Sequence, residues 1–314
     1  MEVAVACVGN VSPTFMKDFF RDNFPNAKIT WRDGLQALMR EEPDTGEFVL
    51  ITDQIQSTDL TTSRQLRGCR ALVLLTDRTV PEWIADGDGS TAKCLDHVVS
   101  LNGNLGYELR FCLRKYLNQD FFGIQQLLAP GTPFATKEVT DSRERPECHS
   151  LIVKYAAQFG IKRGSIRHIR DVSEELLMNA IYDAPHEGGT PCFDHLPRTT
   201  PVSLKPHQRP VLTVGCDGSI FALALRDPFG ALSKESLMAY LGKSTKRFSG
   251  EKIVDNKAGG AGLGMLKILF GCHILSCVVE TGKWTEVLAA VYVTKPLADI
   301  SVMPRSVHFF QVGA

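Results

Sequence analysis

Three stretches contain residues whose types and spacing could support chemistry on a ligand. The first has glycines at positions 260, 262 and 264, followed by the apolar run 265–270. Glycine lets the backbone come close to a ligand, and the free N–H groups at a helix start favour an anion, so phosphate is the natural guest of this turn. A glycine cluster is also common in plain structural turns, so on its own it does not distinguish a phosphate-binding turn from a structural one.

The other two stretches lie upstream of these glycines. Glu175 and Asn179 are four residues apart in the segment 173–180, so they share one face of the helix that this segment predicts. Asp227 ends the apolar segment 223–226, which predicts a strand followed by a turn. The elements that must position the three groups are therefore a helix, a strand, and a glycine turn that leads into a second helix.

This order resembles the GHKL family of ATP-binding domains, which includes gyrase, the histidine kinases and the anti-sigma-factor serine kinases. The likeness is greatest to the anti-sigma-factor type, because residues 150–183 resemble its opening helix, short loop and Ser-Glu-x-x-x-Asn-Ala helix. The resemblance covers residues 150–314 and implies an α/β sandwich, with a mixed, mostly antiparallel sheet backed by helices on one face. Two predicted hairpins, within 211–226 and 273–293, agree with such a sheet.

The resemblance also implies ATP and Mg²⁺ as cofactors and gives individual residues a role. Asp227 would accept a hydrogen bond from the adenine amine, Asn179 would bind Mg²⁺, and Glu175 would activate a hydroxyl or water nucleophile. The other expected nucleotide-binding residues are Asp183, Gly230, Gly260, Gly262, Leu263 and Gly264.

The adenine motif departs from the family pattern. The family usually has Asp-x-Gly-x-Gly, whereas residues 227–231 read Asp-Pro-Phe-Gly-Ala, so Phe229 takes the place of the first glycine. Its bulk could narrow or reshape the adenine pocket. Residues 231–258 correspond to the mobile lid over ATP, and their basic side chains can approach phosphate groups or simply be solvated. These side chains are Lys243, Lys246, Arg247, Lys252 and Lys257.

Residues 1–120 alternate apolar strands with helices, which predicts a doubly wound parallel sheet covered on both faces. The pattern resembles a response-regulator receiver, in which an aspartate that becomes phosphorylated ends the third strand and a threonine ends the fourth. Asp53 and Thr76 fall on these positions. The predicted strands are 3–8, 28–31, 48–53, 71–76 and 95–101, and the predicted helices are 13–23, 34–40 and 106–117.

Two parts of a working receiver are missing from this pattern. A receiver holds Mg²⁺ with an acidic pair after its first strand, where residues 8–10 read Val-Gly-Asn, and it has a lysine after its fifth strand, where residues 100–102 read Ser-Leu-Asn. We therefore expect a degenerate receiver-like domain that is not phosphorylated. A working receiver and another kind of doubly wound domain are the alternatives, and Asp53 can also be a plain strand-end cap.

The expected domains are 1–120 and 148–314. Between them we expect a linker, 121–147, because prolines and a charged run interrupt the pattern there, with a bridging helix within 118–128. The domain after the linker should open with a helix that starts near His149. No pair of long helices precedes His149, so it is expected to be an ordinary helix residue and not a phosphoacceptor.

The proline-rich residues 185–210 predict a long surface loop. Cys192 and His195 have the spacing of half a zinc site, but His186 and His207 do not supply a second close pair, so the loop is favoured over a metal site.

Composition limits the classes of partner. Lysine and arginine total 35, as do aspartate and glutamate, so nucleic acid is not an expected partner. The nine cysteines have no paired spacing and indicate reduced thiols in a cytoplasmic protein. No signal peptide or membrane span is predicted, because the apolar stretch 259–279 contains Lys267 and His273.

These observations together predict a cytoplasmic signalling protein that binds ATP and Mg²⁺ and switches a regulatory protein partner, such as a sigma factor or its antagonist. It would then be a serine/threonine kinase of the anti-sigma-factor type. The first alternative is a non-catalytic, ATP-gated interaction protein, and the second is an atypical histidine kinase of a two-component system. Whether the chain is an enzyme, a protein kinase or an ATPase, or only a non-catalytic interaction protein depends on whether Glu175 does chemistry. The oligomeric state, a homodimer included, stays open.

Overall fold

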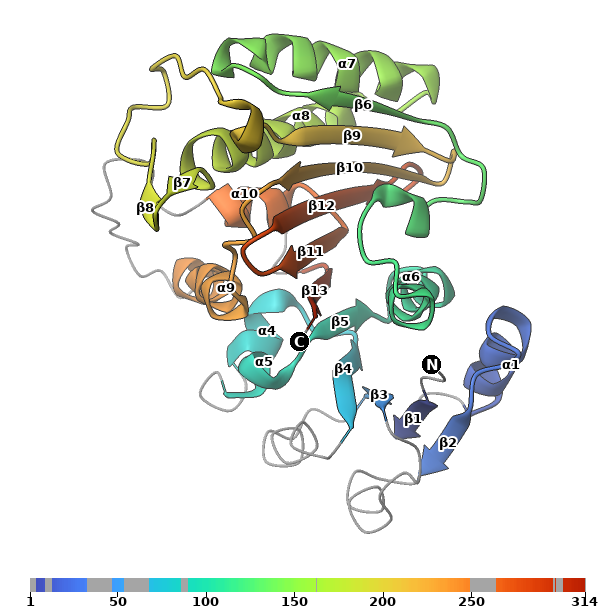
Figure 1. The fold of residues 1–314 in the computed structure, drawn as a ribbon. Coiled ribbons are helices and arrows are strands. Elements are labelled where there is room, and N and C mark those ends of the chain that lie inside the picture. Colours follow the sequence, from blue (N-terminus) through green and yellow to red (C-terminus); the bar gives the residue numbers. More distant parts are fainter. Residues whose placement is uncertain are drawn as a thin grey trace. The chain divides into compact units, whose positions relative to one another are not determined.

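The computed structural model describes residues 4–8, 13–32, 47–53, 68–85, 90–161, 163–248, 264–295, 297 and 302–313. The chain divides into two compact units (Figure 1). The first comprises Met1–Asp120 and Met303–His308, and the second comprises Phe121–Val302 and Phe309–Ala314. Each unit is therefore built from two stretches of chain, and each is described here by itself.

The first unit contains five parallel strands in the order β2-β1-β3-β4-β5. This order is that of flavodoxin-like doubly wound sheets. The residues of β3, β4 and β5 are almost all buried, as expected for parallel strands with both faces covered. The strands are β1 (Ala4–Val8), β2 (Ile29–Arg32), β3 (Phe48–Thr52), β4 (Cys69–Thr76) and β5 (His97–Ser100).

The helices of the first unit are α1 (Pro13–Asn23), α4 (Val80–Ala85), α5 (Ser90–Cys94) and α6 (Leu105–Asn118). Asn104 caps the start of α6, because its side-chain oxygen accepts a hydrogen bond from the N–H group of Tyr107 at 3.3 Å. The five predicted strands and the helices predicted at 13–23 and 106–117 are confirmed to within a few residues. The helix predicted at 34–40 lies outside the described residues.

A sixth strand makes this sheet differ from the expected parallel one. Strand β13 (Ser306–Val312) pairs antiparallel with β5, and His308 lies opposite His97. The N–H group of Ser100 also donates a hydrogen bond to Oγ of Ser306 at 2.9 Å. The C-terminal segment thus occupies the edge of β5, and the sheet is mixed. A purely parallel sheet was the wrong expectation because this partner comes from some 200 residues farther along the chain.

The second unit has an antiparallel sheet in the order β11-β12-β10-β9-β6. Both predicted hairpins are confirmed, since β9 pairs with β10 and β11 pairs with β12. The strands are β6 (Phe134–Glu138), β9 (Val211–Cys216), β10 (Ile220–Asp227), β11 (Ile274–Glu280) and β12 (Trp284–Tyr292). Two short strands, β7 (His186–Glu187) and β8 (Thr190–Pro191), form a separate ribbon.

Helices back this sheet. Helix α8 contacts both α7 and α10, and the three helices pack against β9, β10, β12 and β11 (Figure 1). The side chains of Ile169, Val172, Leu176 and Leu177 of α8 are buried, and each contributes about 1.5–3 kcal/mol through burial. The helices are α7 (Arg145–Gln158), α8 (Arg163–Met178), the π-helical turn η4 (Asn179–Asp183), α9 (Lys234–Phe248) and α10 (Gly264–Phe270). Among its described residues, this unit also has the 3₁₀ turns η2 (Ile124–Gln126), η3 (Ser142–Glu144) and η5 (Pro206–Gln208).

The segment expected to be a linker is structured and belongs to the second unit. Residues 134–138 form the edge strand β6, and the helix expected within 118–128 is only the single turn η2. Because β6 lies at an edge, its side chains are exposed or half-buried. Its sequence therefore lacks the alternation of apolar residues that would predict a strand. Helix α7 begins at Arg145, and His149 therefore lies in its second turn and not at its start.

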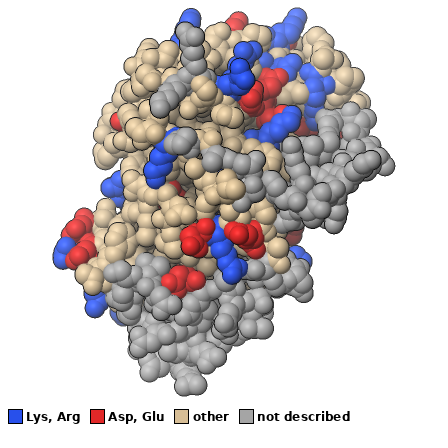
Figure 2. All heavy atoms as spheres, turned by 180° about the vertical axis from the view of Figure 1, so that it is seen from behind, with Lys and Arg blue, Asp and Glu red and all other residues tan. Residues whose placement is uncertain are grey.

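The surface carries both signs of charge. Basic and acidic side chains lie in neighbouring groups on the described surface of the face in Figure 2, in keeping with the formal net charge of zero. Among the helices that the structure describes, none combines the length and the hydrophobicity needed to cross a membrane.

Candidate functional site

Asp227 is the last residue of β10, and it is buried. Antiparallel pairing places it opposite Thr285 of β12, which is also buried. One carboxylate oxygen accepts a hydrogen bond from the N–H group of Phe229 at 3.1 Å. Burial raises the pKa of Asp227 from 3.8 to about 7, because the charged form loses its hydration and backbone N–H groups offset this only in part. The carboxyl group can therefore accept or donate a hydrogen bond near neutral pH.

Gly230 has a backbone reason to be glycine. Its φ is +60°, and a Cβ there would overlap the carbonyl oxygen of Glu280 and lie 2.7 Å from the nitrogen of Gly282. The N–H group of Gly282 donates a hydrogen bond to the carbonyl oxygen of Gly230 at 3.3 Å. A glycine is thus required where the chain after β10 meets the turn between β11 and β12.

Phe229, the departure from the family motif, packs next to the short strand β7. Its side chain is half-buried, and its ring lies 6.3 Å from the ring of His186 at an interplanar angle of 60°. This edge-on arrangement is favourable for aromatic rings. The bulk that replaces the glycine is therefore accommodated beside His186.

Glu175, Asn179 and Gly264 lie together. Gly264 is the first residue of α10, and a Cβ there would stand 2.9 Å from Oε2 of Glu175 and 3.3 Å from Oδ1 of Asn179. Glycine therefore leaves room for these two oxygen atoms between α8 and α10. The prediction that Glu175 and Asn179 share a helix face is confirmed, because both side chains face the same residue of α10.

Glu175 also forms an ion pair with Lys267, which lies one turn beyond Gly264 on α10. The Lys267 side chain is 59% exposed, whereas that of Glu175 is 18% exposed. Because one partner is largely hydrated, the pair contributes no more than about 1 kcal/mol. The carboxylate of Glu175 can therefore exchange this partner for another at small cost.

Helix α8 changes its winding at Asn179. The N–H group of Ala184 donates to the carbonyl oxygen of Asn179 at 2.9 Å, five residues back, as in a π-helix. Single π turns are rare and are frequent at functional sites. Both α8 and η4 pack against β10, the strand that ends at Asp227, so the elements that carry the expected residues are neighbours.

Asp183 ends the π turn and is engaged by the loop that follows. It forms an ion pair with Arg198, whose guanidinium group lies over the ring of Tyr182, 5.1 Å from its centroid. The hydroxyl group of Tyr182 in turn donates to the carbonyl oxygen of Thr200 at 2.7 Å. These contacts give Asp183 a structural partner within the loop 185–210.

Part of the expected site lies outside the described residues. This holds for Gly260, Gly262 and Leu263 of the glycine turn, and for Lys252 and Lys257 of the lid. Of the lid segment 231–258, the structure describes residues 231–248, which include helix α9.

Asp53 directly follows β3, and Thr76 is the last residue of β4. These two strands are parallel neighbours, so both residues lie at the same edge of the first unit's sheet. The hydroxyl oxygen of Thr76 accepts a hydrogen bond from the N–H group of Arg78 at 3.1 Å. Residues 9 and 10, where a receiver has its acidic pair, lie outside the described residues. That this domain is not phosphorylated therefore stays a prediction.

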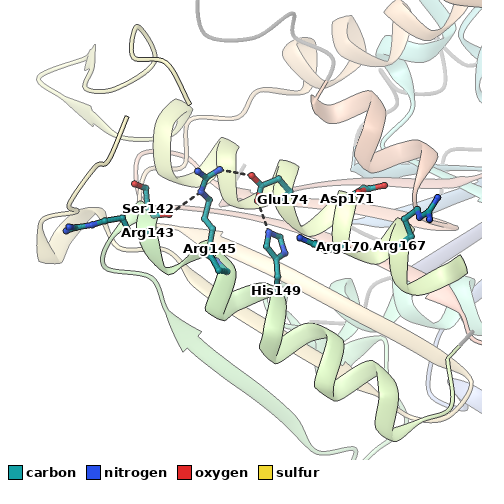
Figure 3. Close-up of a pocket in the computed structure, with 9 residues that line it drawn as sticks. Ser142, Arg143, Arg145, His149, Arg167, Arg170, Asp171 and Glu174 are labelled. Atoms are coloured by element: carbon teal, nitrogen blue, oxygen red, sulfur yellow. Dashed lines mark hydrogen bonds and ion pairs between the residues drawn. The ribbon is translucent and has the colours of Figure 1, made fainter. Parts of the chain in front are cut away.

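An open polar groove of about 750 Å³ lies along α7 and α8 (Figure 3). Arg145 and His149 of α7 point toward Glu174 of α8, at 2.6 Å and 2.7 Å. The other ring nitrogen of His149 lies 2.9 Å from Oγ of Ser173. The hydrogen bond with His149 and the charge of Arg145 lower the pKa of Glu174. This groove is separate from the side of α8 on which Glu175 faces α10.

The histidines and the cysteine of residues 185–210 do not gather as metal ligands in the part of the chain that the structure describes. The thiol of Cys192 instead lies 3.7 Å from the amide nitrogen of Gln208, and His195 is exposed beside Asp194. The expectation of a surface loop agrees with these contacts.

The sequence did not predict that Thr285 and Lys267 lie near the site. Thr285 lies opposite Asp227 only through the pairing of β10 with β12, and Lys267 pairs with Glu175 only because α10 packs on α8. To find Thr285 from the sequence, one would have needed the register between β10 and β12, which are not consecutive in the chain. Lys267 could be noted in sequence only as a charge within an apolar helix.

No protein-family model matches the chain, and no curated protein matches it at a significant level.

Proposed function

We propose that the second unit binds ATP together with Mg²⁺, in the manner of the GHKL domains that its motifs resemble. The observation that carries this proposal is the convergence of Glu175, Asn179 and Gly264 between α8 and α10. Helix α8 and the turn η4, which carry Glu175 and Asn179, also pack against β10, the strand that ends in buried Asp227. Two of the three stretches thus meet directly, and the third is a neighbour through the packing of α8 and η4 on β10.

Asp227 is proposed to read the adenine base. The exocyclic amine of adenine is a hydrogen-bond donor, and a buried carboxylate is a strong acceptor for it. The raised pKa of Asp227 adds a consequence, because a ligand that donates to the carboxylate favours its charged form. ATP binding near pH 7 should therefore release protons from Asp227.

Asn179 is proposed to supply one oxygen ligand to Mg²⁺, which keeps most of its waters and shares the phosphates of ATP. Glu175 lies one helical turn earlier and faces the same residue of α10. Lys267 is more than half exposed and can move from Glu175 to a phosphate group. That exchange would free the carboxylate of Glu175 to accept a proton from a hydroxyl nucleophile.

At the level of the whole chain, the proposed function is a nucleotide-dependent partner switch. In its catalytic form it transfers phosphate to a serine or threonine of a partner protein. A second candidate is a non-catalytic protein in which ATP only controls docking. The pairing of Glu175 with Lys267 favours this candidate, because Lys267 occupies the carboxylate that would have to meet a hydroxyl nucleophile.

Isothermal titration calorimetry of the full chain with ATP and Mg²⁺ tests the proposal. Asp227→Ala should abolish the binding heat, because an apolar wall cannot accept the amine's hydrogen bond. The matched control is Asp194→Ala, which removes a half-exposed carboxylate that pairs with the exposed His195 and should bind as the wild type does. Wild-type protein that gives no heat, or Asp227→Ala that binds as the wild type, would reject nucleotide binding at this site.

A further inference from the structure

Three possible metal ligands meet in the core of the first unit: His97, Cys112 and His308. Their ligand atoms all lie within 4.8 Å of one another, and all three residues have 0% exposure. They come from β5, α6 and β13, which are far apart in the sequence. None of them belongs to the proposed nucleotide site, which lies in the second unit.

The two histidines face each other through the same ring atom. Nδ1 of His308 lies 3.3 Å from Nδ1 of His97, and the two rings stand on opposite positions of the antiparallel pair β5–β13. Two imidazole nitrogens on one tetrahedral zinc ion, each at about 2.0–2.1 Å, are separated by about 3.3–3.4 Å. The spacing between the two histidines already fits a shared metal ion.

We propose that His97, Cys112 and His308 form a buried structural site for a thiophilic d¹⁰ metal ion, zinc(II) or copper(I). Two imidazoles and a thiolate are the ligand set that such ions prefer over magnesium or calcium, which take oxygen ligands. Three protein ligands leave the fourth position of a tetrahedral zinc ion to a water molecule. The complete burial of the three side chains keeps substrate away from that position, which fits a structural role.

The surroundings support this assignment. Nε2 of His97 lies 2.7 Å from the hydroxyl oxygen of Tyr116, a second contact of the kind that fixes the ring orientation of metal-bound histidines. Metal binding would release the thiol proton.

A hydrogen bond between the two histidines is the competing explanation for the short distance. It would use one Nδ1–H group as donor and the other nitrogen as acceptor, and it gives Cys112 no part. The metal site instead accounts for all three side chains and ties the C-terminal strand β13 to β5 and α6. The two explanations differ in metal content, which can be measured.

The test is the metal content of the full chain, expressed in zinc-supplemented and in copper-supplemented medium and dialysed against a chelator. We expect one metal ion per chain from one of the two media, which distinguishes zinc(II) from copper(I). Cys112→Ser should lower the content at least roughly tenfold. The matched control is Cys277→Ser, which changes a buried cysteine of the second unit and should keep the metal.

X-ray absorption of the loaded wild type is the second measurement, and it does not depend on how well any variant folds. It should show one sulfur neighbour at about 2.3 Å and two imidazole nitrogens at about 2.0–2.1 Å, as for zinc; copper(I) would show the same ligand types. Protein without bound metal from both media, a metal shell without sulfur, or equal metal content in Cys112→Ser and wild type would each overturn the site in favour of the histidine hydrogen bond.

Discussion

Replacing Asp227 by asparagine should change how the stability of the chain depends on pH. Asparagine keeps an oxygen acceptor for the N–H group of Phe229 but cannot ionise. In the folded wild type the pKa of Asp227 is about 7, against an ordinary value of 3.8. This difference of about three pH units, at about 1.4 kcal/mol per unit, makes ionisation of the folded state cost about 4 kcal/mol.

The direction follows from proton binding. Between about pH 4 and pH 7 the folded wild type holds a proton on Asp227 that the unfolded chain has already lost, so the wild type loses stability as the pH rises. The stabilisation is complete below the unfolded pKa and is gone above the folded pKa. Relative to the wild type, Asp227→Asn should therefore gain about 4 kcal/mol between pH 4 and pH 8.

Scanning calorimetry of the two full chains at a series of pH values measures this difference. For a unit of this size, about 4 kcal/mol corresponds to a shift of roughly 8–16 °C in the melting temperature of the second unit. Asp194→Asn, which changes a half-exposed acid, should melt in parallel with the wild type across the series. If wild type and Asp227→Asn keep a constant difference from pH 4 to pH 8, Asp227 titrates normally and the reasoning from its burial is wrong.

Three further predictions concern the residues around the site. Gly230→Ala should destabilise the second unit by more than about 3 kcal/mol, because its Cβ would clash with the backbone. Gly188→Ala, also at positive φ but with nothing within 4 Å, should lower the free energy of unfolding by about 1 kcal/mol. Urea denaturation distinguishes the two variants, and equal losses of unfolding free energy would contradict the clash. Gly264→Ala should weaken ATP binding by about tenfold, since its Cβ would stand 2.9 Å from the oxygen of Glu175, whereas Gly164→Ala, with open space around it, should leave the calorimetric affinity unchanged. Glu175→Gln should keep that affinity but lower phosphate release or transfer by about 10²–10⁴-fold; unchanged turnover would remove Glu175 from the chemistry, and wild-type protein that binds ATP without turnover would favour the non-catalytic candidate.

Local patterns were enough to predict most of the elements that carry the site. The four-residue spacing places Glu175 and Asn179 on one face of a helix, and the apolar run before Asp227 predicts β10. Both signals depend only on residues close together in the chain. The turn between β9 and β10 is equally local, because Asp217 accepts hydrogen bonds from the N–H groups of Ser219 and Ile220, each at 2.8 Å.

The features that escaped prediction depend on contacts between distant residues. Strand β13 is fixed by its pairing with β5, and the opposition of His308 to His97 follows from that register alone. Edge strand β6 has side chains that are exposed or half-buried, so the sequence shows no apolar period for it. The partnership of Lys267 with Glu175 likewise requires α10 to pack on α8. Sequence patterns indicate local structure and burial, but they do not indicate which distant residues come into contact.

The most direct test of the central claim is a crystal structure of the full chain with Mg²⁺ and a non-hydrolysable ATP analogue. The account predicts the adenine amine within hydrogen-bonding distance of the Asp227 carboxylate, about 2.7–3.2 Å. It also predicts Mg²⁺ bound to the side-chain oxygen of Asn179 at about 2.0–2.1 Å. An analogue bound in the groove along α7 and α8, or one whose base lies away from Asp227, would contradict the account.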